Sequence, residues 1–260
     1  MPLVKDIYNY LDQLYPFNLA IDFDNVGILV GDGNKKVTRS ICCLDVMPDV
    51  IDEAKNLGVN LIISHHPVIF DPIKNLKPFD IVYQLVAAKI NVICAHTNLD
   101  IAPGGVNSCL AEKLELKNLE VLSHLENNSD HNVGLGLVGT LENSLSSFEF
   151  AKYIKEKLHC NGLKYTNTLD KKISRVAVGS GACGNLINDV IFKKADAFVA
   201  GEIKHHEILL ALQNNIVVVD VGHFKSEDVV VLPLVKVLQE KFPSIEFLKS
   251  TTCTDKIKYI

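Results

Sequence analysis

The sequence predicts an α/β protein made of two similar α/β halves. Apolar runs of strand length alternate with segments whose apolar residues recur at helical spacing, which is typical of βαβ units. The chain has 260 residues, enough for one large domain or two small ones. Apolar periodicity lapses in the polar stretch 123–132, so we expect halves at 1–125 and 126–260, with one interleaved compact unit as the alternative.

The first half is predicted to contain four helices and four strands. The helix at 47–58 has the clearest signals, because Pro48 stands near its start, acids follow, and Gly58 ends it. The other elements rest on their apolar periods. They are helices over 4–14, 79–90 and 104–116, and strands over 26–31, 40–46, 60–64 and 91–95.

The second half repeats the alternation. Its glycine turn, "GSGACG" at 179–184, lacks the spacing of a dinucleotide-binding or phosphate-binding loop, so a plain strand-to-helix turn is expected. The final helix carries an internal Pro233. The predicted elements are strands over 133–141, 197–202, 216–221 and 245–249, a strand and turn over 175–185, and helices over 146–158, 186–195, 206–215 and 226–242.

Composition limits the classes of function. Hydrophobic residues make up 48% and charged residues 22%, as in globular proteins with a buried core. Apolar runs stay short of the roughly 18 residues that span a membrane, and the N-terminus has no signal-peptide pattern, so we expect a cytoplasmic protein. A net charge of −5 disfavours nucleic-acid binding. The seven cysteines include no CxxC and are interpreted as reduced core residues.

Histidines gather where predicted strands end. Each half has a strand followed by a His-His pair, and later an apolar strand that ends in a single histidine. Ligands of open α/β sheets bind at the carboxyl ends of strands. The six histidines at such ends are His65, His66, His96, His205, His206 and His223, and the accompanying acids are Asp100, Glu207 and Glu227.

Each motif also has a purely structural interpretation. The pair His65-His66 fits a strand corner bonded to backbone, and "HTNLD" (96–100) fits a turn closed by its own side chains. His223 and Glu227, four residues apart, fit the capped first turn of a helix. Together the motifs favour a metal site of imidazole and carboxylate, suited to Zn, Fe, Mn or Ni. Five or more such ligands exceed the needs of one catalytic zinc and indicate two ions.

At these residues the sequence resembles the GTP cyclohydrolase I type 2 homologue family, also called the NIF-three-like dinuclear metal-binding family, in its short form. The resemblance covers essentially the whole chain in order. The segments that carry it are "DNVGILVG" (24–31), "LDVMPDVIDEA" (44–54), "IISHHPVIF" (62–70), "AHTNLDIAPGGVN" (95–107), "GSGACG" (179–184), "AGEIKHHEILLA" (200–211) and "VDVGHFKSE" (219–227).

The resemblance implies a ligand set and an assembly. It implies two α/β halves facing each other around a dinuclear metal site, and a homohexamer formed as a trimer of dimers. Phe23 departs from the Trp common in the family, and "AGE" (200–202) replaces a Thr-Gly pattern. Glu227 is the implied bridge between the ions. The implied metal ligands, all present, are His65, His66, Asp100, His223 and Glu227.

The function expected on this basis is metal-dependent hydrolysis. Two divalent ions, with Zn, Fe, Mn, Ni and Co left open, would act on a small molecule such as a guanine nucleotide. His96 or Asp45 would orient the metal ligands through hydrogen bonds without binding the ions themselves. His205 and His206 would contact substrate or transfer protons, or else cap the following helix. The alternatives are a dinuclear phosphoesterase or amidohydrolase, and a non-enzymatic metal-binding or regulatory interaction protein.

Overall fold

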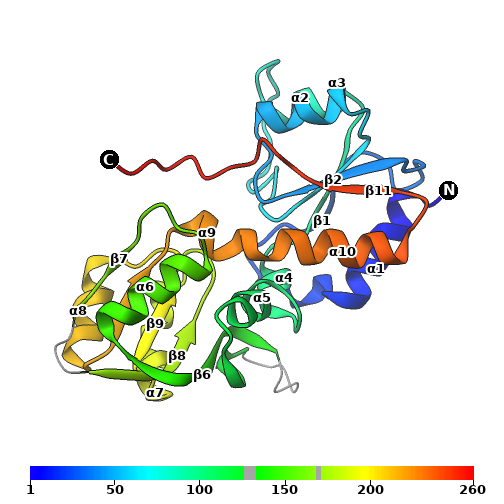
Figure 1. The fold of residues 1–260 in the computed structure, drawn as a ribbon. Helices are drawn as coiled ribbons and strands as arrows, with labels where there is room; N and C mark the ends of the chain where they lie inside the picture. Colours follow the sequence, from blue (N-terminus) through cyan, green and yellow to red (C-terminus); the bar gives the residue numbers. More distant parts are fainter. Residues whose placement is uncertain (126–132, 168–170) are drawn as a thin grey trace. The chain divides into compact units, whose positions relative to one another are not determined.

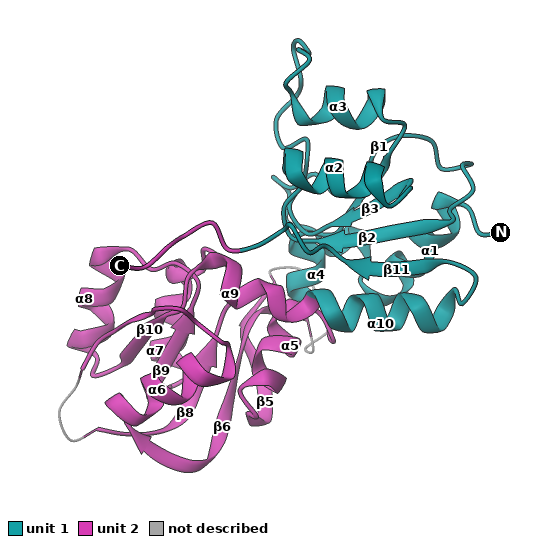
Figure 2. Ribbon diagram, turned by 45° about the horizontal axis from the view of Figure 1, so that its top comes forward, with its two compact units in different colours: residues 1–102, 231–254 teal, residues 103–230, 255–260 magenta. Residues whose placement is uncertain are grey.

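The computed structural model describes residues 1–125, 133–167 and 171–260, and the chain forms two compact units (Figures 1 and 2). Unit 1 contains residues 1–102 and 231–254, and unit 2 contains 103–230 and 255–260. Most of the polar stretch expected as a linker, residues 126–132, lies outside the described residues. Each unit is a mixed α/β structure with one sheet, as the sequence predicts.

The bounds of the units differ from the predicted halves 1–125 and 126–260. The chain leaves unit 1 after Ala102 and returns at Val231. The returning segment supplies α10 (Val231–Lys241) and β11 (Glu246–Lys249). Strand β11 pairs in parallel with β2 (Arg39–Cys43), so the backbone hydrogen bonds of an N-terminal strand are completed from near the C-terminus.

Unit 1 has a five-stranded sheet in the order β1-β4-β3-β2-β11. Strands β2, β3, β4 and β11 are parallel, and β1 pairs with β4 in the antiparallel sense. All residues of β3 and β4 are buried, as expected for parallel strands covered on both faces. The remaining elements of unit 1 are α1 (Val4–Leu14), a 3-10 turn (Phe17–Leu19), β1 (Gly27–Val30), α2 (Pro48–Asn56), β3 (Leu61–Ser64), α3 (Ile81–Ala87), β4 (Asn91–Cys94) and α4 (Thr97–Ile101).

Unit 2 has a six-stranded sheet in the order β5-β6-β8-β9-β10-β7. Strands β8, β9 and β10 are parallel, while β6 pairs with β8 and β7 with β10 in the antiparallel sense. Its elements are α5 (Val106–Lys113), β5 (Lys117–His124), β6 (Gly134–Ser146), α6 (Ser147–Lys157), β7 (Lys164–Tyr165), β8 (Lys172–Val178), α7 (Ile187–Phe192), β9 (Ala197–Ala200), α8 (His205–Gln213), β10 (Val217–Asp220) and α9 (His223–Glu227), with 3-10 turns at Gly184–Leu186 and Asp228–Val230.

Two hydrophobic cores lie on the two faces of the unit 2 sheet. Val176 and Val178 of β8 point into a core with Phe150 of α6, whereas Ala177 points into the other core with Val190 of α7. This alternation follows from the two-residue period of a strand. The sheet of unit 2 is therefore the central layer of three, with helices on both faces.

Most predicted elements are confirmed, and the differences fall in particular places. The helix expected at 226–242 begins earlier, as α9, and passes through a 3-10 turn before α10. Pro233 stands in the first turn of α10, where no backbone N–H is required of it. Strands β5 and β7 and helix α4 were not predicted. Within the described residues, no helix is both long and apolar enough to cross a membrane.

Candidate metal-binding residues

The histidines of unit 1 lie at one edge of its sheet. His65 and His66 follow β3 directly, His96 comes two residues after β4, and Asp45 comes two residues after β2. Because these strands are parallel, their carboxyl ends share one edge. The antiparallel β1 starts at that same edge, which places Asp24 there too. Strand order thus gathers residues that are far apart in the sequence.

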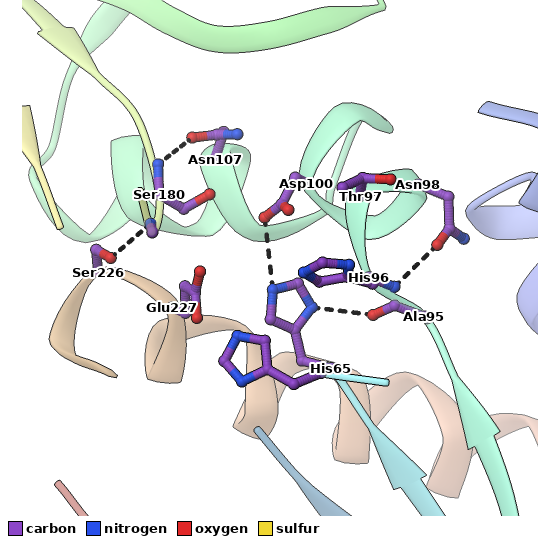
Figure 3. A network of polar contacts seen from close by, with 12 residues as sticks. His65, Ala95, His96, Thr97, Asn98, Asp100, Asn107, Ser180, Ser226 and Glu227 are labelled. Carbon is purple, nitrogen blue, oxygen red and sulfur yellow. Dashed lines mark hydrogen bonds and ion pairs between the residues drawn. The ribbon is translucent and has the colours of Figure 1, made fainter. Parts of the chain in front are cut away.

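Each of the three histidines has its Nδ1 atom against an oxygen. His65 Nδ1 lies 2.9 Å from the carbonyl oxygen of Ala95 (Figure 3). His66 Nδ1 lies 2.8 Å from Asp45 Oδ1, and His96 Nδ1 lies 2.8 Å from Asp24 Oδ1. A carbonyl or ionised carboxylate oxygen can only accept a hydrogen bond, so each Nδ1 carries the proton. In the neutral ring the lone pair is then on Nε2, the atom available to a metal.

The same three rings can converge on one ion. One nitrogen from each of His65, His66 and His96 lies within 4.8 Å of those from the other two. His65 Nε2 is also 3.7 Å from Asp100 Oδ1 of α4 (Figure 3). His65 is almost fully buried, with 2% of its surface exposed. A buried lone pair facing a carboxylate is stabilised when a proton or a metal cation lies between them.

The carboxylate behind His96 is held in its ionised form. Burial alone would raise the pKa of Asp24, but hydrogen bonds from His96 and Thr97 outweigh burial and lower the pKa to about 2. The Thr97 hydroxyl donates over 2.5 Å and the Thr97 backbone N–H over 3.0 Å, both to Asp24 Oδ2. Asp24 is therefore a fixed anion that sets the orientation and tautomer of His96.

Unit 2 has a smaller group of the same kind. Helix α9 places His223 and Glu227 one turn apart, with His223 Nε2 3.1 Å from Glu227 Oε1. His223 Nδ1 lies 3.1 Å from Glu202 Oε1, the counterpart of the carboxylates behind His66 and His96. The Glu227 side chain is 4% exposed. This histidine, too, has Nδ1 directed to an oxygen and Nε2 directed to an acid.

A glycine turn packs against Glu227. Gly181 has φ +58, and a Cβ atom there would collide with Glu227 Oε1 and lie 3.2 Å from His223 Nε2. The N–H of Gly181 donates to Ser226 Oγ over 2.9 Å, and the neighbouring Ser180 N–H donates to Asn107 Oδ1 over 2.9 Å (Figure 3). The turn predicted as a plain connection between strand and helix thus leaves room for the side chains of His223 and Glu227 on α9.

The donor atoms suit a divalent transition metal. Imidazole nitrogen and carboxylate oxygen are ligands of Zn, Fe, Mn and Ni, and metal-bound histidines characteristically donate their second N–H to carboxylate or carbonyl oxygen. His65, His66, His96 and His223 all meet that condition. The residues of unit 1 therefore fit a metal ion through the three imidazoles of His65, His66 and His96, and unit 2 offers one imidazole and one carboxylate of the same kind.

Two other predicted residues lie elsewhere. His205 and His206 open helix α8 and are exposed, and they belong to none of the potential metal groups among the residues that the structure describes. Glu207, beside them, accepts the N–H of Lys204 over 2.7 Å and so caps the helix. The acids Asp24 and Glu202 were missed, because nothing local in the sequence pairs them with histidines 72 and 21 residues away.

Taken together, the fold and these residues define an α/β protein of two units whose strand ends present side chains suited to a divalent metal ion. The chain belongs to the Duf34/NIF3 (NGG1p interacting factor 3) family, whose model matches residues 2–256. The family implied by the sequence resemblance is thereby confirmed.

The chain is similar to several relatives and solved structures over nearly its whole length. A Clostridium perfringens protein described as a GTP cyclohydrolase 1 type 2 homolog is 30% identical over 262 aligned positions, covering 99% of each chain. A Bacillus cereus protein related to NIF3 has a TM-score of 0.94 at 26% identity, covering 100% of this chain and 99% of that one. A Staphylococcus aureus relative with the same description as the first aligns over 365 positions at 26% identity, covering 99% of this chain and 100% of its own. Since this chain has 260 residues, that relative is longer, in keeping with a short form here.

Proposed function

We propose that this protein binds two divalent metal ions and uses them to hydrolyse a small molecule. The observation that carries the proposal is the common arrangement of four histidines, each with Nδ1 against an oxygen acceptor. Histidines that served only to pack a core would not all need an oxygen acceptor at Nδ1. The recurrence of this arrangement in four histidines at the strand ends of both units favours Nε2 ligation of metal, and three of the four belong to the proposed ligand set.

The proposed ligands are the five that the family resemblance implies. His65, His66 and Asp100 come from unit 1, and His223 and Glu227 come from unit 2. Glu227 is proposed as the bridging carboxylate, because its two oxygens can serve different ions. Asp45 supports His66 through its hydrogen bond to Nδ1. His96 meets the same condition but is proposed to orient the ligands, since its ring lies against those of His65 and His66, with centroids 5.2 and 5.6 Å away.

When bound, a pair of such ions lowers the pKa of water and supplies a nucleophile at neutral pH. The residues of the chain would bind the ions and fix the orientation of the ligands. Asp24, Asp45 and Glu202 keep the imidazoles in one tautomer, so ligand geometry is set before any ion arrives. Small-molecule substrates with an electrophilic carbon, including guanine nucleotides, fit this chemistry.

Metal analysis of purified protein tests the proposal. Wild type is expected to hold two divalent ions per chain, and Glu227→Gln about one or none, with hydrolysis of GTP lost in parallel. His205→Ala is the matched control, since it changes a histidine outside these groups. Unchanged metal content in Glu227→Gln would contradict the bridging role of Glu227.

A second candidate function is a non-enzymatic metal-binding or regulatory interaction protein. The family description favours it, since it names an interacting factor. This function predicts tight uptake of metal by wild type without turnover of GTP, phosphate esters or cyclic amides. Turnover of phosphate esters or amides in place of GTP would instead identify a dinuclear phosphoesterase or amidohydrolase.

We also infer a cytoplasmic hexamer of three dimers. Several large apolar side chains are exposed on the loop before α3 and on α3 itself, which supports burial against other copies. The seven cysteines are all buried thiols, in keeping with a reducing compartment. Light scattering of the purified protein and fractionation of cells test the two inferences. The exposed apolar side chains are Phe70, Ile73, Leu76, Phe79, Tyr83 and Val86.

A further inference from the structure

Two cysteines of unit 1 touch each other outside the proposed ligand set. Cys43 is the last residue of β2, and Cys253 lies in the segment that follows β11. The Cys43 thiol donates a hydrogen bond to Cys253 Sγ, and the backbone N–H of Asp45 donates to the same sulfur over 3.5 Å. The two residues are nearly at opposite ends of the chain, so the fold alone makes them neighbours.

The segment that carries Cys253 is held firmly in unit 1. The Ser250 N–H donates to the carbonyl oxygen of Cys42 over 3.0 Å, which continues the pairing of β11 with β2. Ser250 Oγ in turn accepts the N–H of Cys253 over 3.0 Å. Hydroxyls of all three residues 250–252 donate to the carboxylate of Glu53 on α2, at 2.5 to 2.9 Å. Contact between the two sulfurs is therefore built into the packing of this segment.

The two thiols are chemically unequal. The hydrogen bond from Cys43 and the N–H groups of Leu44 and Asp45 outweigh burial and lower the pKa of Cys253 to about 7. The same hydrogen bond, together with burial, raises the pKa of Cys43 well above its ordinary value. Thiolate is the reactive form of cysteine in disulfide exchange, so Cys253 is the attacking sulfur and Cys43 the resolving one.

We propose that Cys43 and Cys253 form a thiol–disulfide site that is oxidised by a low-molecular-weight disulfide such as oxidised glutathione. Cys253 Sγ attacks one sulfur of the oxidant, the sulfur–sulfur bond of the oxidant breaks, and one glutathione thiolate leaves. Cys43 Sγ, on losing its proton, then attacks Cys253 Sγ and releases the second glutathione. Two protein thiols are oxidised to one disulfide, and one disulfide is reduced to two glutathione thiols.

The site is coupled to metal binding through Asp45, a step that rests on the proposed function. The backbone N–H of Asp45 contacts Cys253 Sγ, and its carboxylate holds His66 Nδ1 at 2.8 Å. A disulfide draws Cys253 Sγ to Cys43 and removes the thiolate that this N–H stabilises. Movement of Asp45 then alters the orientation of a proposed metal ligand, so oxidation is expected to weaken metal binding.

Peptide mapping of metal-free full-length protein after treatment with oxidised glutathione tests the disulfide. The expected product has lost about 2 Da, the two thiol hydrogens, and yields a cross-linked peptide pair containing Cys43 and Cys253. Cys42→Ala is the matched control, because it removes the adjacent thiol of β2, whose side chain points to the other face of the sheet. This variant is expected to form the same cross-link.

Other products would overturn the inference. In Cys43→Ser, oxidation is expected to stop at a glutathione adduct on Cys253. An untouched Cys253 in folded wild type, or a cross-link that persists in Cys253→Ser, would contradict the assigned pair. Mapping wild type directly keeps the test decisive even if a serine variant folds poorly.

Zinc affinity of the reduced and disulfide forms tests the coupling. We expect the disulfide form to bind Zn²⁺ roughly 10- to 100-fold more weakly, and the Cys43→Ser, Cys253→Ser double variant to be unaffected by the oxidant. Equal affinities of the two wild-type forms would overturn the coupling. Absence of zinc binding in both forms would contradict the proposed function and the coupling together, while a mapped disulfide would stand.

Discussion

The two units share an arrangement of four strands within their sheets but place different residues at the strand ends. In unit 1, β2, β3 and β4 run parallel and are joined by α2 and α3; in unit 2, β8, β9 and β10 run parallel and are joined by α7 and α8. Each set has an antiparallel strand beside its last member, β1 or β7. Each last strand leads to a five-residue helix, α4 or α9.

The difference lies after the middle strand. In unit 1 the two residues after β3 are His65 and His66, whereas the two residues after β9 are Gly201 and Glu202. The last strands lead to matching pairs, His96 with Asp100 and His223 with Glu227, each four residues apart. Unit 1 thus has imidazoles at the two positions where unit 2 has a glycine and a supporting carboxylate. The shared strand arrangement fixes where these positions lie, but not which side chain occupies them.

The largest loss of metal affinity is expected when unit 1 receives the residues that follow the middle strand of unit 2. The double change His65→Gly with His66→Glu gives unit 1 the strand end of unit 2. We expect divalent metal affinity to fall by more than roughly 100-fold, beyond the loss caused by supporting residues, because both proposed imidazole ligands are removed and a single carboxylate takes their place. Isothermal titration with Zn²⁺ measures the loss, and circular dichroism checks the fold. Retention of wild-type affinity would show that these histidines are not ligands.

A methyl group at Gly181 probes the space around Glu227 in unit 2. Gly181→Ala adds left-handed backbone strain and a collision with Glu227 Oε1, so we expect about 3 kcal/mol of destabilisation. Gly58→Ala is the matched control in unit 1, since Gly58 has φ +66 and a Cβ atom added there would meet nothing within 4 Å. It is expected to cost about 1 kcal/mol. Equal losses in urea denaturation would exclude the collision.

The carboxylates behind the histidines sharpen the comparison. Asp24 has a fully buried side chain, whereas the side chain of Glu202 is 59% exposed. We expect Asp24→Asn to weaken metal binding by about 100-fold and Glu202→Gln by about 10-fold, since water can replace an exposed partner. Competition with a fluorescent chelator measures both. A larger loss in Glu202→Gln would reverse the proposed order of importance.

Acid unfolding tests the buried carboxylate of unit 1. The folded-state pKa of Asp24 is about 2, below its ordinary 3.8, so the carboxylate stabilises the fold above pH about 4 and loses this effect as pH falls toward 2. The shift corresponds to about 2 kcal/mol. Urea denaturation across this range should show a steeper acid loss in wild type than in Asp24→Asn. Parallel curves for the two proteins would contradict the assignment.

The smallest effect is expected at the second His-His pair. The double change His205→Ala with His206→Ala alters exposed side chains at the start of α8, so stability should change by about 0.5 kcal/mol or less. Metal content should stay at the wild-type level. A lost metal ion in this variant would mean that the pair serves unit 2 as His65 and His66 are proposed to serve unit 1.

The sequence predicts the strands well where both faces are buried. Strands β3, β4 and β10 are mostly apolar and buried along their whole length, and a histidine that the pattern alone singles out follows each within three residues. Strand β5 was missed because its first four residues are exposed and show no alternation. Helix α4 was missed because "HTNLD" fits a turn equally well, and five residues are too few for a helical period.

The supporting contacts could not be predicted from the sequence. The parallel between His65-His66 and His205-His206 is misleading, since the first pair follows its strand directly while the second begins a helix. Glu202, predicted as the end of a strand, lies two residues after β9, the position that His66 has after β3. Contacts such as Asp24 with His96 depend on which strands become neighbours, and strand order follows from packing of the whole sheet.

The late return of the chain to unit 1 has a consequence for synthesis on the ribosome. Strand β2 is made early, but β11, which covers its outer edge, emerges only after all of residues 103–230. Until then the nascent protein exposes an unpaired, apolar strand edge of the kind that recruits other chains. In unit 2, by contrast, all six strands of the sheet have been synthesised once β10 is made. Nascent chains stalled before residue 246 should therefore engage chaperones through unit 1.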